Sequence, residues 1–108
     1  MSEEKGHNGW KNYATWGVKL ILDNDEGSNE YWMEQAVRHL RTAEPIIPGC
    51  TKEDKARWNL DEQLRDEITD EVYTAIEDCG YMVSQLMGAA LCEVDWQEIA
   101  DSFIDDAK

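Results

Sequence analysis

Apolar residues recur at steps of three and four along most of the chain, which is the spacing that predicts α-helices. The C-terminal segment shows this most clearly, because Asp95 and Glu98 form a capping-box pattern at the start of a regular apolar series. This series consists of Trp96, Ile99, Ala100, Phe103 and Ile104. The sequence therefore predicts an amphipathic helix near the end of the chain.

Two further helices are predicted from weaker signals. Ser28 can cap the first, which carries one apolar stripe and ends before the loop that contains Pro45. The stripe consists of Trp32, Met33, Ala36, Val37 and Leu40. The second helix spans about residues 81–91, although Gly88 weakens it by about 1 kcal/mol relative to alanine.

The longest apolar stripe lies between Leu60 and Cys79, and Gly80 follows it as a typical helix stop. Capping-box patterns at 51–54 and 59–62 predict a short helical turn that precedes this long helix. The stripe itself consists of Leu64, Ile68, Val72, Ala75 and Ile76.

The segment after Asn12 is compatible with two structures. A helix capped by Asn12 would run to about Asp23 with Tyr13, Trp16 and Leu20 at helical spacing. The apolar alternation over residues 16–22 is also typical of a strand. Because Ile21 breaks that alternation, the helix is favoured.

Together these elements predict an all-α fold, a compact single domain of four or five helices with one long central helix. Residues 1–9 are polar and are expected to form a flexible lead-in, and residues 10–108 the single helical domain. A length of 108 residues and a hydrophobic fraction of 42% suit one core.

Charge and composition narrow the possible partners. The chain has 24 acidic and 10 basic side chains, a formal charge of −14, so direct binding to nucleic acid or to an anionic membrane is not expected. No apolar run is long enough to span a bilayer.

Cys50, Cys79 and Cys92 are widely spaced, which predicts buried free thiols in a reducing compartment. The protein is expected to be soluble and cytoplasmic.

The sequence contains no recognisable catalytic constellation. It has no Walker A loop, no GxGxxG, no GxSxG and no HExxH. His7 lies in the lead-in and His39 on the predicted polar side of its helix, so a paired catalytic role is not expected. We expect no enzyme activity, no cofactor and no metal site.

The most informative feature is a set of acidic residues on the predicted long helix. At about 100° per residue they lie opposite the apolar stripe or flank it, and Arg65 is their only local compensation. Like charges four residues apart cost about 0.2–0.5 kcal/mol per pair in an isolated helix. The set consists of Glu62, Asp66, Glu67, Asp70, Glu71, Glu77 and Asp78.

Three explanations of the surface stay open. The acids form either a solvated face or an imitation of nucleic-acid phosphates that occupies the basic groove of a DNA- or RNA-binding protein. Asp101, Asp105 and Asp106 extend the array if the last helix packs beside the long one. The third explanation is a helical interaction module or adaptor that binds through an exposed aromatic patch, with Trp10 or Trp58 as the anchor.

Two segments resemble those of a family of small, largely uncharacterised proteins found in phages, plasmids and bacterial genomes. Residues 10–16 read WKNYATW, where the family has W-x-N-Y-E-T-W. Residues 90–100 read ALCEVDWQEIA, where it has a-L-x-E-V-N-W-x-E-I-A. The departures are Ala14 in place of Glu and Asp95 in place of Asn.

The resemblance, combined with small size and acidity, is similar to the profile of phage-borne inhibitors of host defence, including anti-CRISPR and antirestriction proteins. It implies a host nuclease, restriction enzyme or CRISPR effector as the partner. It brings no catalytic residues with it, and it leaves open whether the chain forms a dimer.

Overall fold

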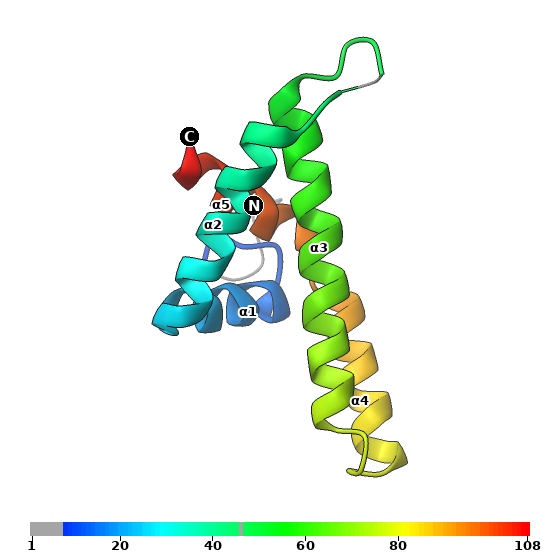
Figure 1. The fold of residues 1–108 in the computed structure, drawn as a ribbon. Coiled ribbons are helices and arrows are strands. Elements are labelled where there is room, and N and C mark those ends of the chain that lie inside the picture. Colours follow the sequence, from blue (N-terminus) through cyan, green and yellow to red (C-terminus); the bar gives the residue numbers. More distant parts are fainter. Residues whose placement is uncertain (1–7, 46) are drawn as a thin grey trace.

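The computed structural model describes residues 8–45 and 47–108, which form five α-helices (Figure 1). Most of the predicted 1–9 lead-in, including His7, lies outside these residues. The prediction of a compact all-α single domain is confirmed. The helices are α1 (Tyr13–Asn24), α2 (Glu26–Thr42), α3 (Lys52–Ala75), α4 (Tyr81–Glu93) and α5 (Trp96–Ala107).

The core lies where α5 packs against α2 and the N-terminal half of α3. Every member of the apolar series predicted for α5 is buried. Leu60 and Leu64 of α3 and Phe103 of α5 are all fully buried in this core. Burying side chains of this size contributes about 1.5–3 kcal/mol each, so this contact is the main source of stability.

The helix predicted after Asn12 is confirmed, and the strand alternative is wrong. The Asn12 side chain accepts a hydrogen bond from the Thr15 backbone N–H at 2.9 Å, which caps α1. The apolar residues at helical spacing do not form its inner face, however, because Tyr13 and Leu20 are exposed. Thr15, Lys19 and Leu22 are buried instead.

Lys19 is buried because its charge is paired on one side and covered on the other. Its Nζ lies 2.6 Å from Asp23 Oδ1 and 4.5 Å above the Phe103 ring, so the ammonium group keeps a counter-charge and a cation–π contact. A lysine at this position is therefore compatible with the core, although its residue type indicates the surface.

Helix α2 also differs in detail from the prediction. It begins at Glu26 after the N-cap position Asp25, and Ser28 donates a hydrogen bond to Asp25 instead of capping the helix. His39 was expected on the polar side but is buried, with Nε2 2.7 Å from Gln63 Oε1. Burial lowers the pKa of His39, so the neutral imidazole is favoured.

Helix α3 is one continuous helix, and the predicted break before Leu60 is wrong. Thr51 and Asp54 form a complete capping box, with Asp54 N donating to Thr51 Oγ1 at 2.9 Å, and the helix continues through Asn59. It ends at Ala75, before the predicted stop, because residues 76–79 turn the chain back into α4. Gly80, at a φ of 94°, provides the left-handed backbone that leads into α4.

The two segments singled out by their tryptophans meet in space. Thr15 Oγ1 accepts a hydrogen bond from the Asp95 backbone N–H at 2.8 Å and donates one to Asn12 Oδ1 at 2.8 Å. Asn12 Nδ2 donates to the carbonyl of Glu93 at 2.7 Å, and the Lys11 N–H donates to Glu98 Oε1 at 3.0 Å. The start of α1 is therefore tied to the start of α5.

The Thr15 hydroxyl is expected to be a principal stabilising group of this junction. The change Thr15→Val keeps the shape but leaves the Asp95 N–H without its acceptor, and should lower the free energy of unfolding by about 1–3 kcal/mol in urea titrations. Thr15→Ser retains the hydroxyl and should cost only about 0.8 kcal/mol for the lost methyl group. Equal stability of the valine variant and the wild type would contradict this role.

Candidate functional site

The C-terminal half of α3 and the whole of α4 run side by side and project away from the other helices (Figure 1). We call residues 66–93 the α3–α4 arm. Among the described helices, α4 packs against only α1 and α3, and none of its residues is fully buried. The arm therefore presents a large surface that lies outside the core.

Five of the predicted acidic residues lie on α3, and all five are exposed. We call them the α3 acids: Glu62, Asp66, Glu67, Asp70 and Glu71. They divide between two sides of the helix. Asp66 and Asp70 line a groove beside α4, whereas Glu67 and Glu71 line a smaller hollow beside α2.

The α3 acids are compensated to different degrees. Arg65 Nε lies 3.8 Å from Asp66 Oδ1, and both side chains are largely exposed, so this pair contributes little. Glu67 accepts a hydrogen bond from Tyr31 Oη at 2.8 Å, which raises the pKa of Tyr31. The Asp70 carboxylate makes no ion pair or hydrogen bond with another side chain of residues 8–45 and 47–108. Most of the negative charge on α3 is thus left for solvent or a partner.

Glu77 and Asp78 are wrongly placed by the sequence analysis. Both are exposed, but they lie in the turn at the tip of the arm and not on the long helix, because α3 has already ended at Ala75. They add negative charge to the tip without sharing the rigid spacing of the α3 acids.

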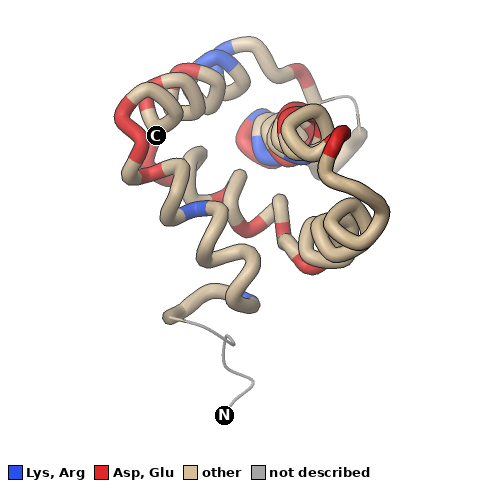
Figure 2. Tube along the Cα trace, turned by 90° about the horizontal axis from the view of Figure 1, so that it is seen from below, with Lys and Arg blue, Asp and Glu red and all other residues tan. Residues whose placement is uncertain are grey.

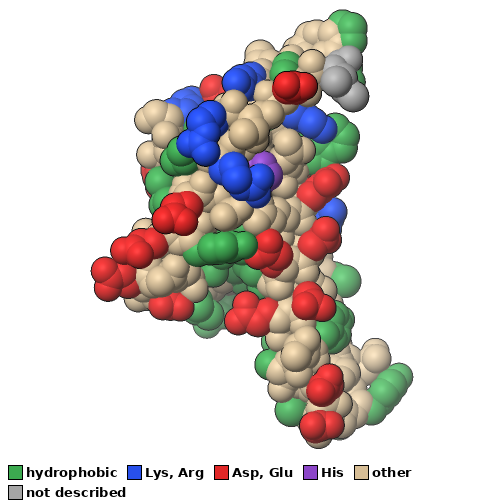
Figure 3. Space-filling view, viewed as in Figure 1, with side chains coloured by type: hydrophobic (Ala, Val, Ile, Leu, Met, Phe, Trp, Pro, Cys, Tyr) green, Lys and Arg blue, Asp and Glu red, His purple; other side chains and the backbone are tan. Residues whose placement is uncertain are grey.

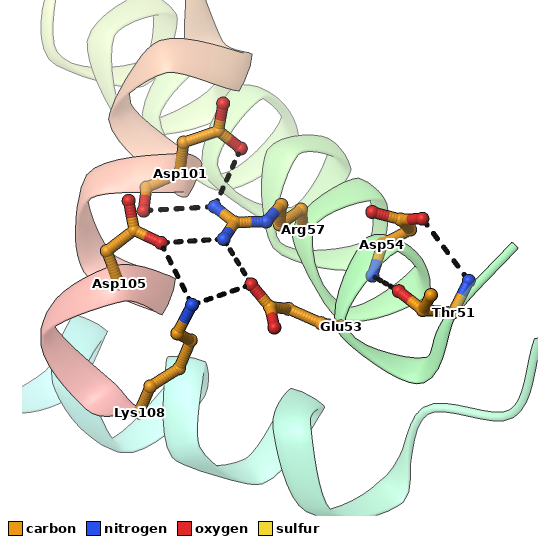
Figure 4. Close-up of polar contacts among 7 residues, drawn as sticks. All are labelled: Thr51, Glu53, Asp54, Arg57, Asp101, Asp105 and Lys108. Atoms are coloured by element: carbon orange, nitrogen blue, oxygen red, sulfur yellow. Dashed lines mark hydrogen bonds and ion pairs between the residues drawn. The ribbon is translucent and has the colours of Figure 1, made fainter.

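The predicted extension through α5 is wrong for Asp101 and Asp105, although α5 does pack against α3. Arg57 Nη1 lies 3.3 Å from Asp101 Oδ1, and Arg57 Nη2 lies 2.6 Å from Asp105 Oδ1 (Figure 4). Arg57 also pairs with Glu53, to which Lys108 donates at 2.9 Å. These carboxylates hold α5 against α3, and their pairing with Arg57 and Lys108 offsets most of their charge.

Asp106 is exposed on α5 and takes no part in the ion pairs of Arg57. Within the network, the hydrogen bond from Arg57 holds the pKa of Asp105 below its usual value, and that from Lys108 does the same for the pKa of Glu53. Burial raises the pKa of Asp101 in spite of Arg57. The ionised forms of Asp105 and Glu53 are thus stabilised, whereas burial disfavours the ionised form of Asp101.

Replacing Arg57 by Met should lower the free energy of unfolding by about 1–3 kcal/mol at pH 7, because Asp101 would lose its cation. The pKa values of Asp105 and Glu53 are lower in the folded protein than in the unfolded chain. Ionisation of these two carboxylates therefore stabilises the fold at neutral pH, and this contribution is lost as the pH falls through their folded-state pKa values. The difference between variant and wild type should therefore shrink below about pH 4 in urea titrations.

The exposed Arg65 supplies the matched control for this measurement. Arg65→Met should change stability by less than about 0.5 kcal/mol at either pH. A difference for Arg57→Met that is the same at pH 3 and pH 7 would show that lost packing, and not the ion pairs, accounts for it.

The groove between α3 and α4 has a volume of about 610 Å³. Its walls combine the carboxylates of Asp66 and Asp70 with apolar groups that include Leu91 and Trp96. Gly88 lets α4 come close on this side, because a Cβ there would meet Tyr73 Oη at 2.9 Å. A long basic side chain suits such a groove, since its methylenes pack on the apolar part while its charge meets the carboxylates.

The two predicted aromatic anchors do not form one patch. Trp10 is half-buried and packs against the core, so the prediction of an exposed anchor is wrong for it. Trp58 is 48% exposed, but Lys55 Nζ lies 4.4 Å over its ring and its Nε1 donates to Glu62 at 2.8 Å. Trp58 therefore adjoins the α3 acids.

Residues 8–45 and 47–108 also show how the possible metal ligands and the cysteines are placed. No three His, Cys, Asp or Glu side chains there are arranged to hold a metal ion. The prediction of buried cysteines is wrong, because Cys79 in the turn and Cys92 on α4 lie in the uncovered arm. None of the helices in this part of the chain has the length and apolar composition that crossing a membrane requires.

No family model, curated protein or solved structure matches the chain. The family resemblance of the two tryptophan segments therefore stays a prediction. A functional proposal therefore rests on the exposed surface, above all on the α3 acids and the groove beside them.

Proposed function

We propose that the protein is a non-enzymatic inhibitor that binds a nucleic-acid-handling protein, with the α3 acids in the groove that otherwise receives phosphates. The observation that carries this proposal is the rigid arrangement of five exposed carboxylates on one helix. Among the residues that the structure describes, Arg65 is the one cation that pairs with them. They lie on one continuous helix whose N-terminal half is anchored in the core through Ala56, Leu60 and Leu64, so the helical repeat sets their spacing.

The density of the charges supports the comparison with a nucleic acid. From residue 62 to residue 71 the helix rises about 13 Å, so five charges are spaced about 3.4 Å apart along its axis. A single strand of B-form DNA carries one phosphate per 3.4 Å of axis, and the duplex carries twice that density. The α3 acids thus match one strand in linear density, although they point to two sides of the helix.

The charges are also separated by sign over the surface. On the face shown in Figure 3, Asp and Glu side chains follow α3 to the tip of the arm and gather at the turn between α1 and α2. Lys and Arg gather at the other end, over the C-terminal part of α2. Such a separation favours approach of the arm, and not of the opposite end, to a basic groove.

The resemblance to phage and plasmid proteins supports the same class of partner. A phage- or mobile-element-borne inhibitor of this type would meet a host nuclease, restriction enzyme or CRISPR effector in the host cytoplasm. It would act as an anti-CRISPR or antirestriction protein, and would need neither a cofactor nor catalytic residues of its own.

Charge reversal on α3 tests the proposal. The triple variant Glu62→Lys, Asp66→Lys, Asp70→Lys should lose about a hundredfold in affinity for a target nuclease, since attraction to its basic groove becomes repulsion. Affinity capture from host lysate at low salt, with elution along a salt gradient, identifies the target. DNA-cleavage assays with that purified nuclease then measure inhibition, which should be competitive with DNA.

Glu26, Glu30 and Glu34 of α2 provide the matched control, because they are exposed and have the same four-residue spacing. Reversing them should leave most of the inhibition intact, while circular dichroism reports the helix content of both triple variants. Full inhibition by the α3 variant, or inhibition that survives about 0.5 M salt, would rule out phosphate imitation.

The adaptor alternative is favoured by one observation, the exposure of Trp58. If Trp58 is an anchor, Trp58→Ala should weaken binding more than the α3 charge reversal does, and binding should persist at high salt.

A further inference from the structure

Helix α4 is predominantly apolar, with Ser84 and Gln85 among its few polar residues, yet it lies outside the core. None of residues 81–92 is charged, and in Figure 2 α4 is an almost entirely tan helix beside the red and blue of α3. Tyr81 is 80% exposed, Met82 74% and Leu86 64%. A helix with so few polar residues normally packs in the protein interior. This one has no buried residue.

The side of α4 that packs within the chain is a different one. Met87, Gly88 and Leu91 are half-buried, and Gly88 and Leu91 line the groove shared with α3. At 100° per residue, Met82 and Leu86 lie roughly opposite Leu91 on the helix. Val83, Ala89 and Ala90 extend the exposed stripe. We call Met82, Val83, Leu86, Ala89 and Ala90 the outer face of α4.

Charge around the outer face indicates what can cover it. The arm contains seven acidic residues and neither Lys nor Arg. The acids are Asp66, Glu67, Asp70, Glu71, Glu77, Asp78 and Glu93. Glu77 and Asp78 lie just before α4, and Glu93 is its last residue, so the apolar face is bounded by negative charge at both ends.

This boundary disfavours a second copy of the chain. Antiparallel pairing of two α4 helices would bring Glu93 of each copy toward Glu77 and Asp78 of the other. Each copy also carries a net charge of −14. Like charges that meet at an interface oppose association, whereas opposite charges favour it.

We propose that the outer face of α4 docks an amphipathic helix of a partner protein, one whose apolar stripe is flanked by Lys or Arg. The apolar stripe would cover Met82 and Leu86, and the basic residues would face the acids at the two ends of α4. This is recognition of a helix by an apolar surface, with charge that selects the partner. It goes beyond the inhibitor function, because it assigns a second surface, and its test does not depend on inhibition.

Two synthetic peptides of about 18 residues, long enough for five helical turns, probe this surface with the full-length protein. Both carry leucines at i, i+3, i+4 and i+7 spacing. One has Lys at its flanking positions and the other has Glu. Fluorescence anisotropy at physiological salt should show binding of the Lys peptide and no binding of the Glu peptide.

The double variant Met82→Gln, Leu86→Gln should weaken binding of the Lys peptide about tenfold or more. The control Leu20→Gln, Ile21→Gln changes two exposed apolar residues of α1, and Ile21 at 67% exposure matches Leu86. It should leave binding unchanged. Because all four side chains are exposed, both variants should keep their helix content in circular dichroism.

Other outcomes overturn the proposal. They are failure of the Lys peptide to bind the wild type, equal binding of the Glu peptide, and equal losses in the two double variants. Sedimentation analysis gives a separate check: a wild-type dimer that Met82→Gln, Leu86→Gln dissociates would show that a second copy covers α4. Loss of inhibition through the α3 charge reversal with peptide binding retained would separate the two surfaces.

Discussion

The polar junction between the starts of α1 and α5 is the constraint on which the arrangement of the helices depends. Thr15 is fully buried, and its hydroxyl both accepts from the Asp95 N–H and donates to Asn12. An N–H at the start of a helix has no partner within the helix, so each such contact removes a desolvation cost that burial would otherwise impose. Because the contacts join segments 80 residues apart, they fix where the ends of the folded chain meet.

This junction, together with the packing of α5 on α3, confines the rigid core to one half of α3. The other half extends beyond it beside α4, with Ile68 and Val72 only half-buried. Helices gain most of their stability from packing, so an arm with this little burial is stabilised less than the core. The acidic and apolar surfaces proposed to bind partners both lie on this arm, whereas the contacts that determine the fold lie elsewhere.

Helix α5 was predictable because its five apolar positions and its capping residue agree with one another. Helix α1 shows where such prediction fails. Its apolar spacing indicates an inner face through Tyr13 and Leu20, but the buried positions are Thr15 and Lys19, which are satisfied by Asp95 and Asp23. Asp95 lies far from Thr15 in the sequence, and the Lys19–Asp23 pair depends on the conformation of two side chains. Residue type and spacing alone therefore cannot reveal either partner.

The candidate site was predictable to the extent that it depends on a single helix. The exposure of Glu62, Asp66 and Asp70 follows from the helical repeat and the apolar stripe opposite them. The pairing of Asp101 and Asp105 with Arg57 does not follow in this way, since it requires the register of α5 against α3. The uncovered side of α4 is a similar case: its sequence indicates a buried helix, and only the fold shows that none of residues 8–45 and 47–108 buries it. Such a helix lowers its free energy when a partner covers it, and the acids around it favour a basic partner.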